Sequence, residues 1–313
     1  MLQPAQVPSR HPRAPAHDVA MPDTRIVQIF CNPGSGSYSP RRIEALVQAF
    51  EALGADVRIS DDVSTAPQIA GDATHICIVG GDGTVRHVAS AVARGGHMQL
   101  LGIHPSGTVN LLAREAGQAR TPQHFATQLL SEGAEYPHYP VAVGEEYFLA
   151  CASAGPDSAA IARLSDRLKR WIGRYAYLAA FLGLLWRWPR PRIVIEADGV
   201  THHCEAFYVA KGRYFAGQWS FAPRARVDDP LLHIVALQTA RRRDFLWFAW
   251  SLLRGWDPAA LPRVTAFTCK TLTAASDDAV PVQADGDIIA TLPVKLILCE
   301  TPIRFRKMMP EGL

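Results

Sequence analysis

The sequence lacks a hydrophobic run long enough to cross a membrane. Its longest apolar run, from Tyr175 to Trp186, has 12 residues, whereas a helix needs ~20 to span a bilayer. Residues 1–22 are rich in Pro and Ala and contain no apolar core of the signal-peptide type. The sequence therefore predicts a disordered leader, no transmembrane helix and no secretion, and it favours a cytoplasmic protein.

Closely spaced cysteines and a strong net charge are also missing. The six cysteines include no CxxC pair, which favours reduced thiols over disulfides. No second ligand cluster accompanies His202-His203-Cys204, so we expect an ordinary exposed strand there rather than a metal site. A net charge of only +3 over 313 residues argues against a nucleic-acid-binding protein.

The N-terminal part alternates short apolar runs with helical patterns. We expect strands at 26–31, 55–60, 74–79 and 100–105, and helices after Pro40, after Gly83 and through Leu111. A strand, a loop and a helix are expected to repeat four times in this order, which is typical of a doubly wound α/β domain with a parallel sheet. We place this domain at residues 23–139.

From about Val141 the pattern changes to strands. One or two helices over 158–186 and one around 245–253 interrupt a series of strand-like stretches, which predicts an antiparallel, β-rich second domain at 140–300. The C-terminal segment, 301–313, is expected to return to the first domain. An exposed strand edge in the second domain would also suit a homodimer.

Three loops follow the first, third and fourth predicted strands, with the sequences NPGSG, GGDGT and PSGTVN. The carboxyl ends of parallel strands share one edge of a sheet, and Gly, Ser and Thr there offer backbone N–H groups and hydroxyls to an anion. The Walker pattern GxxxxGK[ST] is absent, and GxGxxG fails because its third glycine is replaced by Arg86. A carboxylate inside such a loop suits phosphoryl transfer, in which a cation or an acceptor hydroxyl is also present.

These loops resemble those of the diacylglycerol kinase catalytic family, which includes bacterial lipid kinases and sphingosine kinases. The likeness continues through SAGPDSAAIARLSDRLKRWIGRYAYLAA, then YVAKGRYFAGQWSFAPRARVDDPLLHIVAL, and then VPVQADGDIIATLPVKLIL, and it covers about residues 25–305 in order. The resemblance implies an NAD kinase/diacylglycerol kinase-like α/β domain, a C-terminal β-sandwich, and nucleotide bound in the cleft between them. It also implies ATP and Mg²⁺ as cofactors and a lipid hydroxyl as the acceptor.

The resemblance assigns roles to individual residues. Asp287 falls at the position of the family's catalytic base, a Glu, and Asp82 and Asp157 support this acidic cluster. The metal turn would use the side chain of Asp229 and the carbonyl of Leu231, with Arg226 at a third ligand position. The positions that match nucleotide contacts are Asn32, Pro33, Gly34, Ser35, Gly36, Ser60, Gly80, Gly81, Asp82, Gly83, Thr84, Val85, Arg86 and Thr108.

The sequence departs from the family pattern at several of these positions. Arg86 stands where Asn is usual, Pro230 replaces a Gly, and Arg226 brings a cation to the metal turn. Asp287 is one methylene shorter than Glu, and a base misplaced by ~1 Å can lose a hundredfold in rate. A weakly active protein, or a non-catalytic binder of nucleotide and lipid, is therefore an alternative. A second is an NAD kinase-like enzyme with a soluble substrate.

Two basic, aromatic segments are candidates for membrane docking. The segment from Arg163 to Arg192 carries eight Arg or Lys and one acid, which fits either peripheral binding at the inner membrane face or a buried helix with solvated arginines. For the second segment, from Arg241 to Trp256, we expect a helix packed on the sandwich. No motif identifies the lipid.

Overall fold

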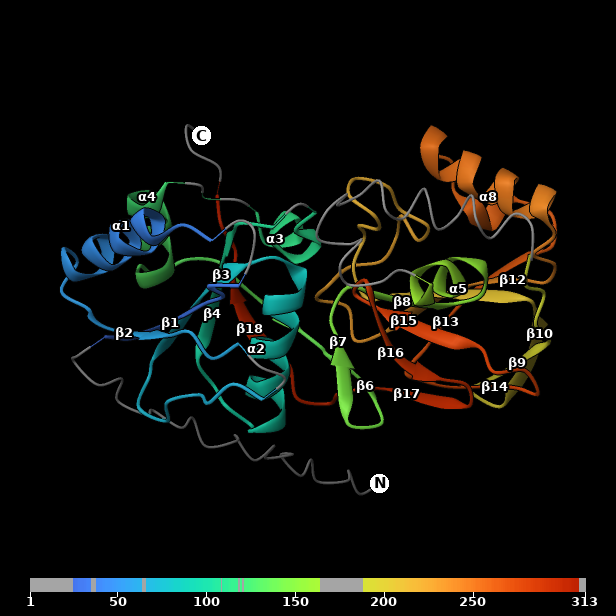
Figure 1. The fold of residues 1–313 in the computed structure, drawn as a ribbon, viewed down its shortest axis with the longest axis horizontal. Coiled ribbons are helices and arrows are strands. Elements are labelled where there is room, and N and C mark those ends of the chain that lie inside the picture. Colours follow the sequence, from blue (N-terminus) through green and yellow to red (C-terminus); the bar gives the residue numbers. More distant parts are fainter. Residues whose placement is uncertain are drawn as a thin grey trace, which may run out of the picture.

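A computed structural model describes residues 25–34, 38–63, 66–107, 109–117, 119, 121–163 and 188–309. Two domains lie side by side along the long axis of the molecule (Figure 1). The predicted leader, most of the basic segment 163–192, and residues 310–313 fall outside the described residues.

The first domain is built on a six-stranded sheet in the order β2-β1-β3-β4-β18-β5. The neighbouring strands from β2 to β18 are parallel, and β5 is antiparallel to β18. The bounds are β1 Ile26–Cys31, β2 Asp56–Ser60, β3 His75–Gly80, β4 Leu100–Pro105, β5 Glu135–His138 and β18 Ile303–Arg306. Strand β18 thus brings the end of the chain back from the second domain into the first sheet.

Helices cover both faces of this sheet. Helix α1 begins at Pro40, a residue suited to the first turn, and buries Ile43, Leu46 and Phe50. It packs beside α4, whereas α2 and α3 contribute to a separate core cluster. The bounds are α1 Pro40–Glu51, α2 Asp82–Arg94, α3 Leu111–Ala116 and α4 Pro122–Leu130. This confirms the doubly wound α/β prediction.

One detail of that prediction is wrong. Strand β2 leads to β3 without a helix in the described residues 61–63 and 66–74, so the repeat of strand, loop and helix is incomplete. Residues 61–74 are rich in Asp, Ala and Thr and have no continuous apolar face at helical spacing. A helix there would have had little apolar surface to bury against the sheet.

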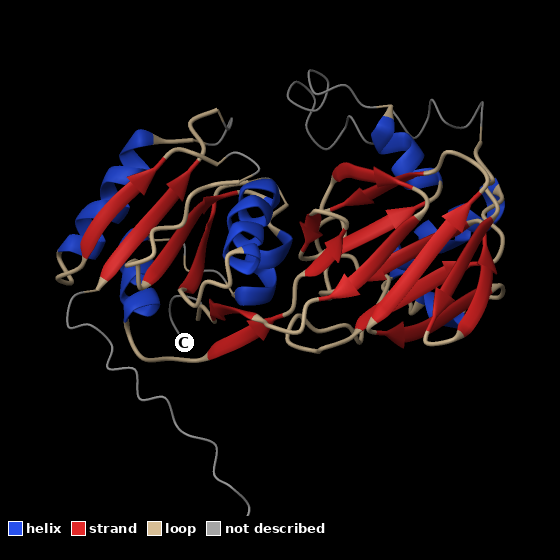
Figure 2. Cartoon of the chain, turned by 90° about the horizontal axis from the view of Figure 1, so that it is seen from below, coloured by secondary structure: helices blue, strands red, loops and turns tan. Residues whose placement is uncertain are grey.

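The second domain packs two antiparallel six-stranded sheets face to face (Figure 2). Their orders are β10-β9-β14-β17-β6-β7 and β13-β12-β11-β8-β15-β16. Apolar side chains from both sheets, including Phe148, Phe207 and Leu296, form one buried cluster between them. This confirms the expected β-sandwich.

The strands of the sandwich are short, and two α-helices accompany them in the described part of the chain. The strand bounds are β6 Val141–Val143, β7 Glu146–Phe148, β8 Cys151–Ala154, β9 Ile193–Ala197, β10 Val200–Cys204, β11 Ala206–Ala210, β12 Leu232–Leu237, β13 Val264–Cys269, β14 Thr271–Ser276, β15 Pro281–Ala284, β16 Asp287–Thr291 and β17 Val294–Leu298. The helices are α5 Pro156–Ala162 and α8 Arg242–Arg254, with a short 3₁₀ turn at Pro258–Ala260.

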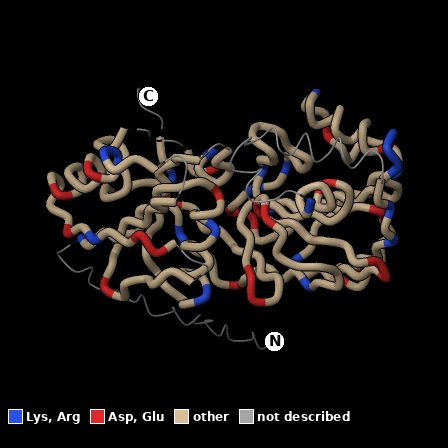
Figure 3. The backbone as a smooth tube through the Cα atoms, viewed as in Figure 1, with Lys and Arg blue, Asp and Glu red and all other residues tan. Residues whose placement is uncertain are grey.

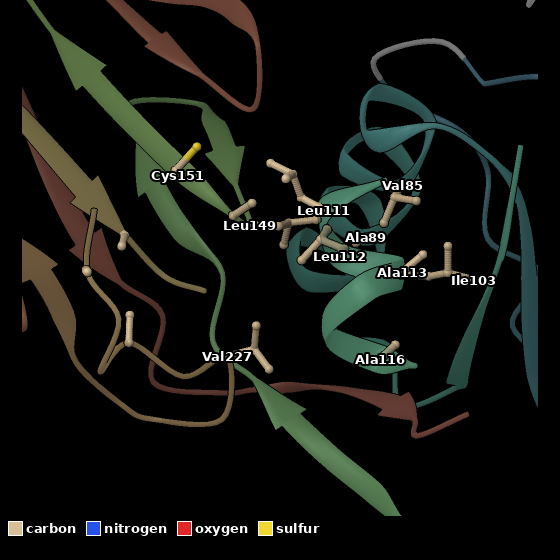
Figure 4. Close-up of a cluster of buried hydrophobic side chains, with 14 of the residues drawn as sticks. Val85, Ala89, Ile103, Leu111, Leu112, Ala113, Ala116, Leu149, Cys151 and Val227 are labelled. Carbon is tan, nitrogen blue, oxygen red and sulfur yellow. The ribbon is translucent and has the colours of Figure 1, made fainter. Parts of the chain in front are cut away.

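An apolar cluster joins the two domains. Leu111 and Leu112 of α3 share this cluster with Leu149, which lies just before β8, and with Cys151, its first residue (Figure 4). His138, at the end of β5, is completely buried, and its Nε2 is 2.8 Å from the carbonyl oxygen of Leu149. These contacts hold the loops of the first domain against the second.

Candidate active site

The three glycine-containing loops follow β1, β3 and β4, as the sequence predicts. Asn32 closes the first loop by accepting a hydrogen bond from Gly34 N at 2.9 Å. Asn110 closes the third loop, where its side chain bonds to both the N–H and the carbonyl of Gly107. Ser60 lies at the end of β2, at the same edge of the sheet. Among the candidate residues, Ser35, Gly36 and Thr108 fall outside the described residues.

The second and third loops touch each other backbone to backbone. A Cβ atom on Gly107 would lie 2.5 Å from the Cα of Gly81, and a Cβ on Gly81 would lie 3.2 Å from the Cα of Gly107. The amide of Ser106 also donates to the carbonyl of Gly80 at 3.1 Å. Glycine is required at this crossing because no side chain fits between the two loops.

Asp82 opens helix α2 and lies against the first turn of α3. Its Oδ1 accepts a hydrogen bond from Leu112 N at 3.4 Å. Burial raises the pKa of Asp82 to about 6, and the carboxylate of Asp285 adds to the rise, while backbone N–H donors at the start of α3 oppose it. Gly83, Thr84 and Val85 follow in the same first turn, where N–H groups and the helix dipole favour an anion.

Asp285, which the sequence reasoning missed, is a carboxylate of the second domain whose charge acts on Asp82. Its two oxygens accept hydrogen bonds from the amides of Leu149, Ala150 and Cys151 at 2.8–3.0 Å. Burial raises the pKa of Asp285, and these three donors and Arg86 oppose the rise. The signal was present in the sequence: Asp-Gly after a strand marks a turn, and Asp285 adopts a positive φ of 49° there.

Arg86 and Asp287 meet across the domain junction. The guanidinium Nη2 of Arg86 is 3.0 Å from Oδ2 of Asp287, and its Nη1 is 3.9 Å from Glu146. Arg86 is only 5% exposed, although it lies on α2 and its partners lie on β16 and β7. Acidic residues thus approach the junction from both domains (Figure 3).

Asp157 extends the acidic group along the second domain. It opens helix α5 and accepts hydrogen bonds from Ser153 Oγ at 2.5 Å and from the hydroxyl of Tyr208 at 3.3 Å. Burial raises the pKa of Asp157, which these donors oppose. Burial raises the pKa of the Cys151 thiol, and the negative charges of Asp285, Asp82 and Asp157 add to the rise.

The acidic turn at residues 226–231, just before β12, is in contact with cationic side chains of the protein itself. The ammonium of Lys211, which is completely buried, donates to the carbonyl oxygens of Arg226, Val227 and Asp229 at 3.2, 2.8 and 2.7 Å. Burial lowers the pKa of Lys211 to about 8, and the nearby acids oppose this shift.

Both carboxylates of this turn also have cationic or histidine partners. Arg226 forms a bidentate ion pair with Asp228 at 2.9 and 2.7 Å, and His233 Nε2 lies 3.2 Å from Asp229. Leu231 ends the turn just before β12. In the described part of the chain, no group of three or more His, Cys, Asp or Glu side chains could hold a metal ion. Lys211 therefore takes three carbonyl oxygens of this turn, and His233 lies against the Asp229 carboxylate that the metal expectation names.

Two family models match the chain in succession. The diacylglycerol kinase catalytic domain matches residues 27–137, and the YegS C-terminal NAD kinase beta sandwich-like domain matches residues 150–312.

Individual relatives agree with these matches. A Pseudomonas aeruginosa PAO1 protein named "Probable lipid kinase YegS-like" is 36% identical over 243 residues, 74% of this chain and 76% of its own length. The diacylglycerol kinase of Bacillus subtilis strain 168 is 27% identical over 243 residues, 73% of this chain and 78% of its own. The crystal structure of a diacylglycerol kinase from Bacillus anthracis strain Sterne shares the fold, with a TM-score of 0.70 at 19% identity over 90% of this chain and 96% of that one. The chain belongs to the family of diacylglycerol and YegS-like lipid kinases.

Proposed function

We propose that this protein transfers the γ-phosphoryl group of ATP to the hydroxyl of a lipid at the junction of its two domains. One observation carries the proposal: the glycine loops of the first domain and the carboxylates of the second meet at this junction, around Asp82, Asp285 and Asp287. Family membership supports kinase activity and the use of ATP.

Each group has a distinct task in this proposal. The glycine loops and the first turn of α2 would bind the phosphates through backbone N–H groups. The lipid hydroxyl would attack the γ-phosphorus, the bond to the β-phosphate oxygen would break to release ADP, and the hydroxyl proton would pass to Asp287. Asp285, held by three amides, would fix the β15–β16 turn that carries Asp287.

Mg²⁺, bound with the nucleotide, would neutralise the phosphate charge during transfer. Asp82 and the loop residues around it would face such a complex. We do not assign a metal to Asp229, Leu231 and Arg226, because Lys211 and Arg226 already supply cations to that turn. None of the described helices is long and apolar enough to cross a membrane.

The direct test is phosphorylation of a lipid panel in mixed micelles with labelled ATP and Mg²⁺. The panel comprises diacylglycerol, monoacylglycerol, a sphingoid base, phosphatidylglycerol and undecaprenol. Asp287→Asn should abolish transfer, and Asp287→Glu should retain or increase it. If no lipid is phosphorylated under any condition, the proposal is wrong.

A further inference from the structure

Helix α8 has an apolar outer face as well as an apolar inner face. Phe245, Phe248 and Leu252 point into the molecule, where the ring of Phe248 stacks on Tyr208 with the centroids 4.7 Å apart. The expected packing of this helix on the sandwich is therefore present. The opposite side, however, carries the exposed side chains of Leu246, Trp247, Trp250 and Leu253.

The exposure of these four residues is large. Their exposed fractions are 58%, 60%, 48% and 55%, and Trp256, just beyond the helix, is 49% exposed. The positions follow helical spacing and form one stripe on the side away from the buried residues. Contiguous exposed apolar surface of this kind marks a binding surface, whereas single exposed apolar residues are common on any protein.

Positive charge surrounds the stripe. Figure 3 shows basic positions at both ends of α8. They are Arg241, Arg242 and Arg243 at its start and Arg254 at its end, and all four are exposed. Arg254 lies 5.9 Å from the ring centres of both Trp250 and Trp256. The one acidic residue of the helix, Asp244, accepts a hydrogen bond from Thr239 at 2.8 Å and sits beside Arg243.

Tryptophan and leucine flanked by arginine match the chemistry of an anionic lipid surface. Indole rings sit well at the boundary between headgroups and acyl chains, and arginines bind lipid phosphates. A second copy of the chain fits less well, because two α8 helices placed face to face would bring their arginines together. Figure 1 shows α8 at an outer corner of the second domain, where it can meet a flat surface.

We propose that the outer face of α8, defined by Leu246, Trp247, Trp250 and Leu253, docks the protein on an anionic membrane. This deepens the proposed lipid kinase function by naming the surface through which the enzyme reaches its substrate. Binding needs neither ATP nor turnover, so the docking surface is testable by itself.

The test is co-sedimentation with vesicles, either of phosphatidylcholine alone or of phosphatidylcholine mixed equally with phosphatidylglycerol. We expect binding to the mixed vesicles that weakens at high salt, and little binding to phosphatidylcholine alone. Trp247→Ser combined with Trp250→Ser should lower the partition coefficient at least about tenfold. Arg242→Gln and Arg243→Gln should each lower it about fivefold.

The matched control is Met98→Ser combined with Val200→Ser. These residues are 62% and 54% exposed but lie outside α8, so binding should be unchanged. In the wild type, brominated acyl chains should quench tryptophan fluorescence, and the double tryptophan variant should lose most of this quenching. Circular dichroism would verify that each variant is folded.

Three results would overturn the proposal: undiminished binding of the tryptophan variant, equal binding to both kinds of vesicle, or a dimer that these tryptophan substitutions dissociate. Assays on a short-chain, water-soluble lipid separate the two proposals. Phosphorylation of that lipid without vesicle binding would contradict only the proposed docking surface. Vesicle binding without phosphorylation of any lipid would contradict only the proposed kinase function.

Discussion

Arg86 and Asp287, 201 residues apart in the chain, form an ion pair of 3.0 Å between the first domain and the second. Each residue departs from the pattern of the family at its own position, where Asn and Glu are usual. The structure places the two departures in contact. We infer that they compensate: the long cationic side chain of Arg86 fills space and supplies charge beside a carboxylate that is one methylene shorter.

A double-mutant cycle on Arg86→Asn and Asp287→Asn should reveal this coupling. Asp287→Asn leaves the buried guanidinium without this partner and should lower the free energy of unfolding by about 2 kcal/mol. The two changes together should cost less than the sum of the single changes, with a coupling energy of about 1 to 2 kcal/mol by urea unfolding. Glu146→Gln, at the longer 3.9 Å contact, is the control and should change little. Strictly additive effects would contradict the inference.

Asp82 should lower stability at neutral pH. Its pKa of about 6 lies above the usual value of 3.8, so the folded state favours the protonated form and stability falls as the pH rises from about 4 to 6. Asp82→Asn should therefore raise the free energy of unfolding by about 2 kcal/mol at pH 8 and by much less at pH 4, while kinase activity falls. Urea unfolding at the two pH values measures this, and an equal effect at both would contradict the assignment.

His138 should make the domain junction sensitive to acid. Burial lowers the pKa of His138 to about 3, below its usual 6.5, and the charge of Lys211 adds to the effect. Because the unfolded state binds the proton more readily, stability should fall as the pH drops below 6.5, by up to about 1.4 kcal/mol per pH unit.

The variant His138→Gln keeps a donor for the carbonyl of Leu149 and should flatten this slope between pH 6.5 and 4. His203→Gln changes an exposed histidine on β10 and serves as the control. The measurement is the urea midpoint across this pH range. A slope that His138→Gln leaves intact would show that other groups set the acid response.

We expect the ammonium of Lys211 to stabilise the acidic turn in the place of a metal ion. Lys211→Met removes the donor of three carbonyl groups and should lower the free energy of unfolding by about 3 kcal/mol. The wild type, without nucleotide, should show the same Tm in EDTA and in millimolar Mg²⁺. Lys270→Met, at an exposed lysine, is the matched control. A marked fall of the wild-type Tm in EDTA would show that the turn does hold a metal.

Gly107→Ala should separate the two phosphate loops. Its new Cβ atom would lie 2.5 Å from Gly81 Cα, so one loop must move and the stabilisation by ATP should be lost in a thermal shift assay. The control is Gly71→Ala, because nothing lies within 4 Å of a Cβ at Gly71, an exposed residue that precedes β3 at the end opposite to the loops. If Gly107→Ala still responds to ATP as the wild type does, the crossing of the loops is not needed for binding.

The sequence alone determined the local structure and the family. Apolar runs of strand length and helical spacing after Pro40 and Gly83 identified most elements of the first domain, because these patterns record which face of each element is buried. The glycine loops were found from their composition, because two backbones that approach closely require glycine. The non-helical structure of residues 61–63 and 66–74 could not be predicted in this way, because polar residues specify no single structure.

Only the tertiary structure decided which charges meet. Asp285 accepts amide hydrogen bonds from a strand more than 130 residues away, and Lys211 fills the turn expected to bind a metal. Arg86, expected at a phosphate, pairs with Asp287. Electrostatic partners depend on distance and burial in the folded chain, and no local spacing encodes these when the partners belong to different elements of the fold.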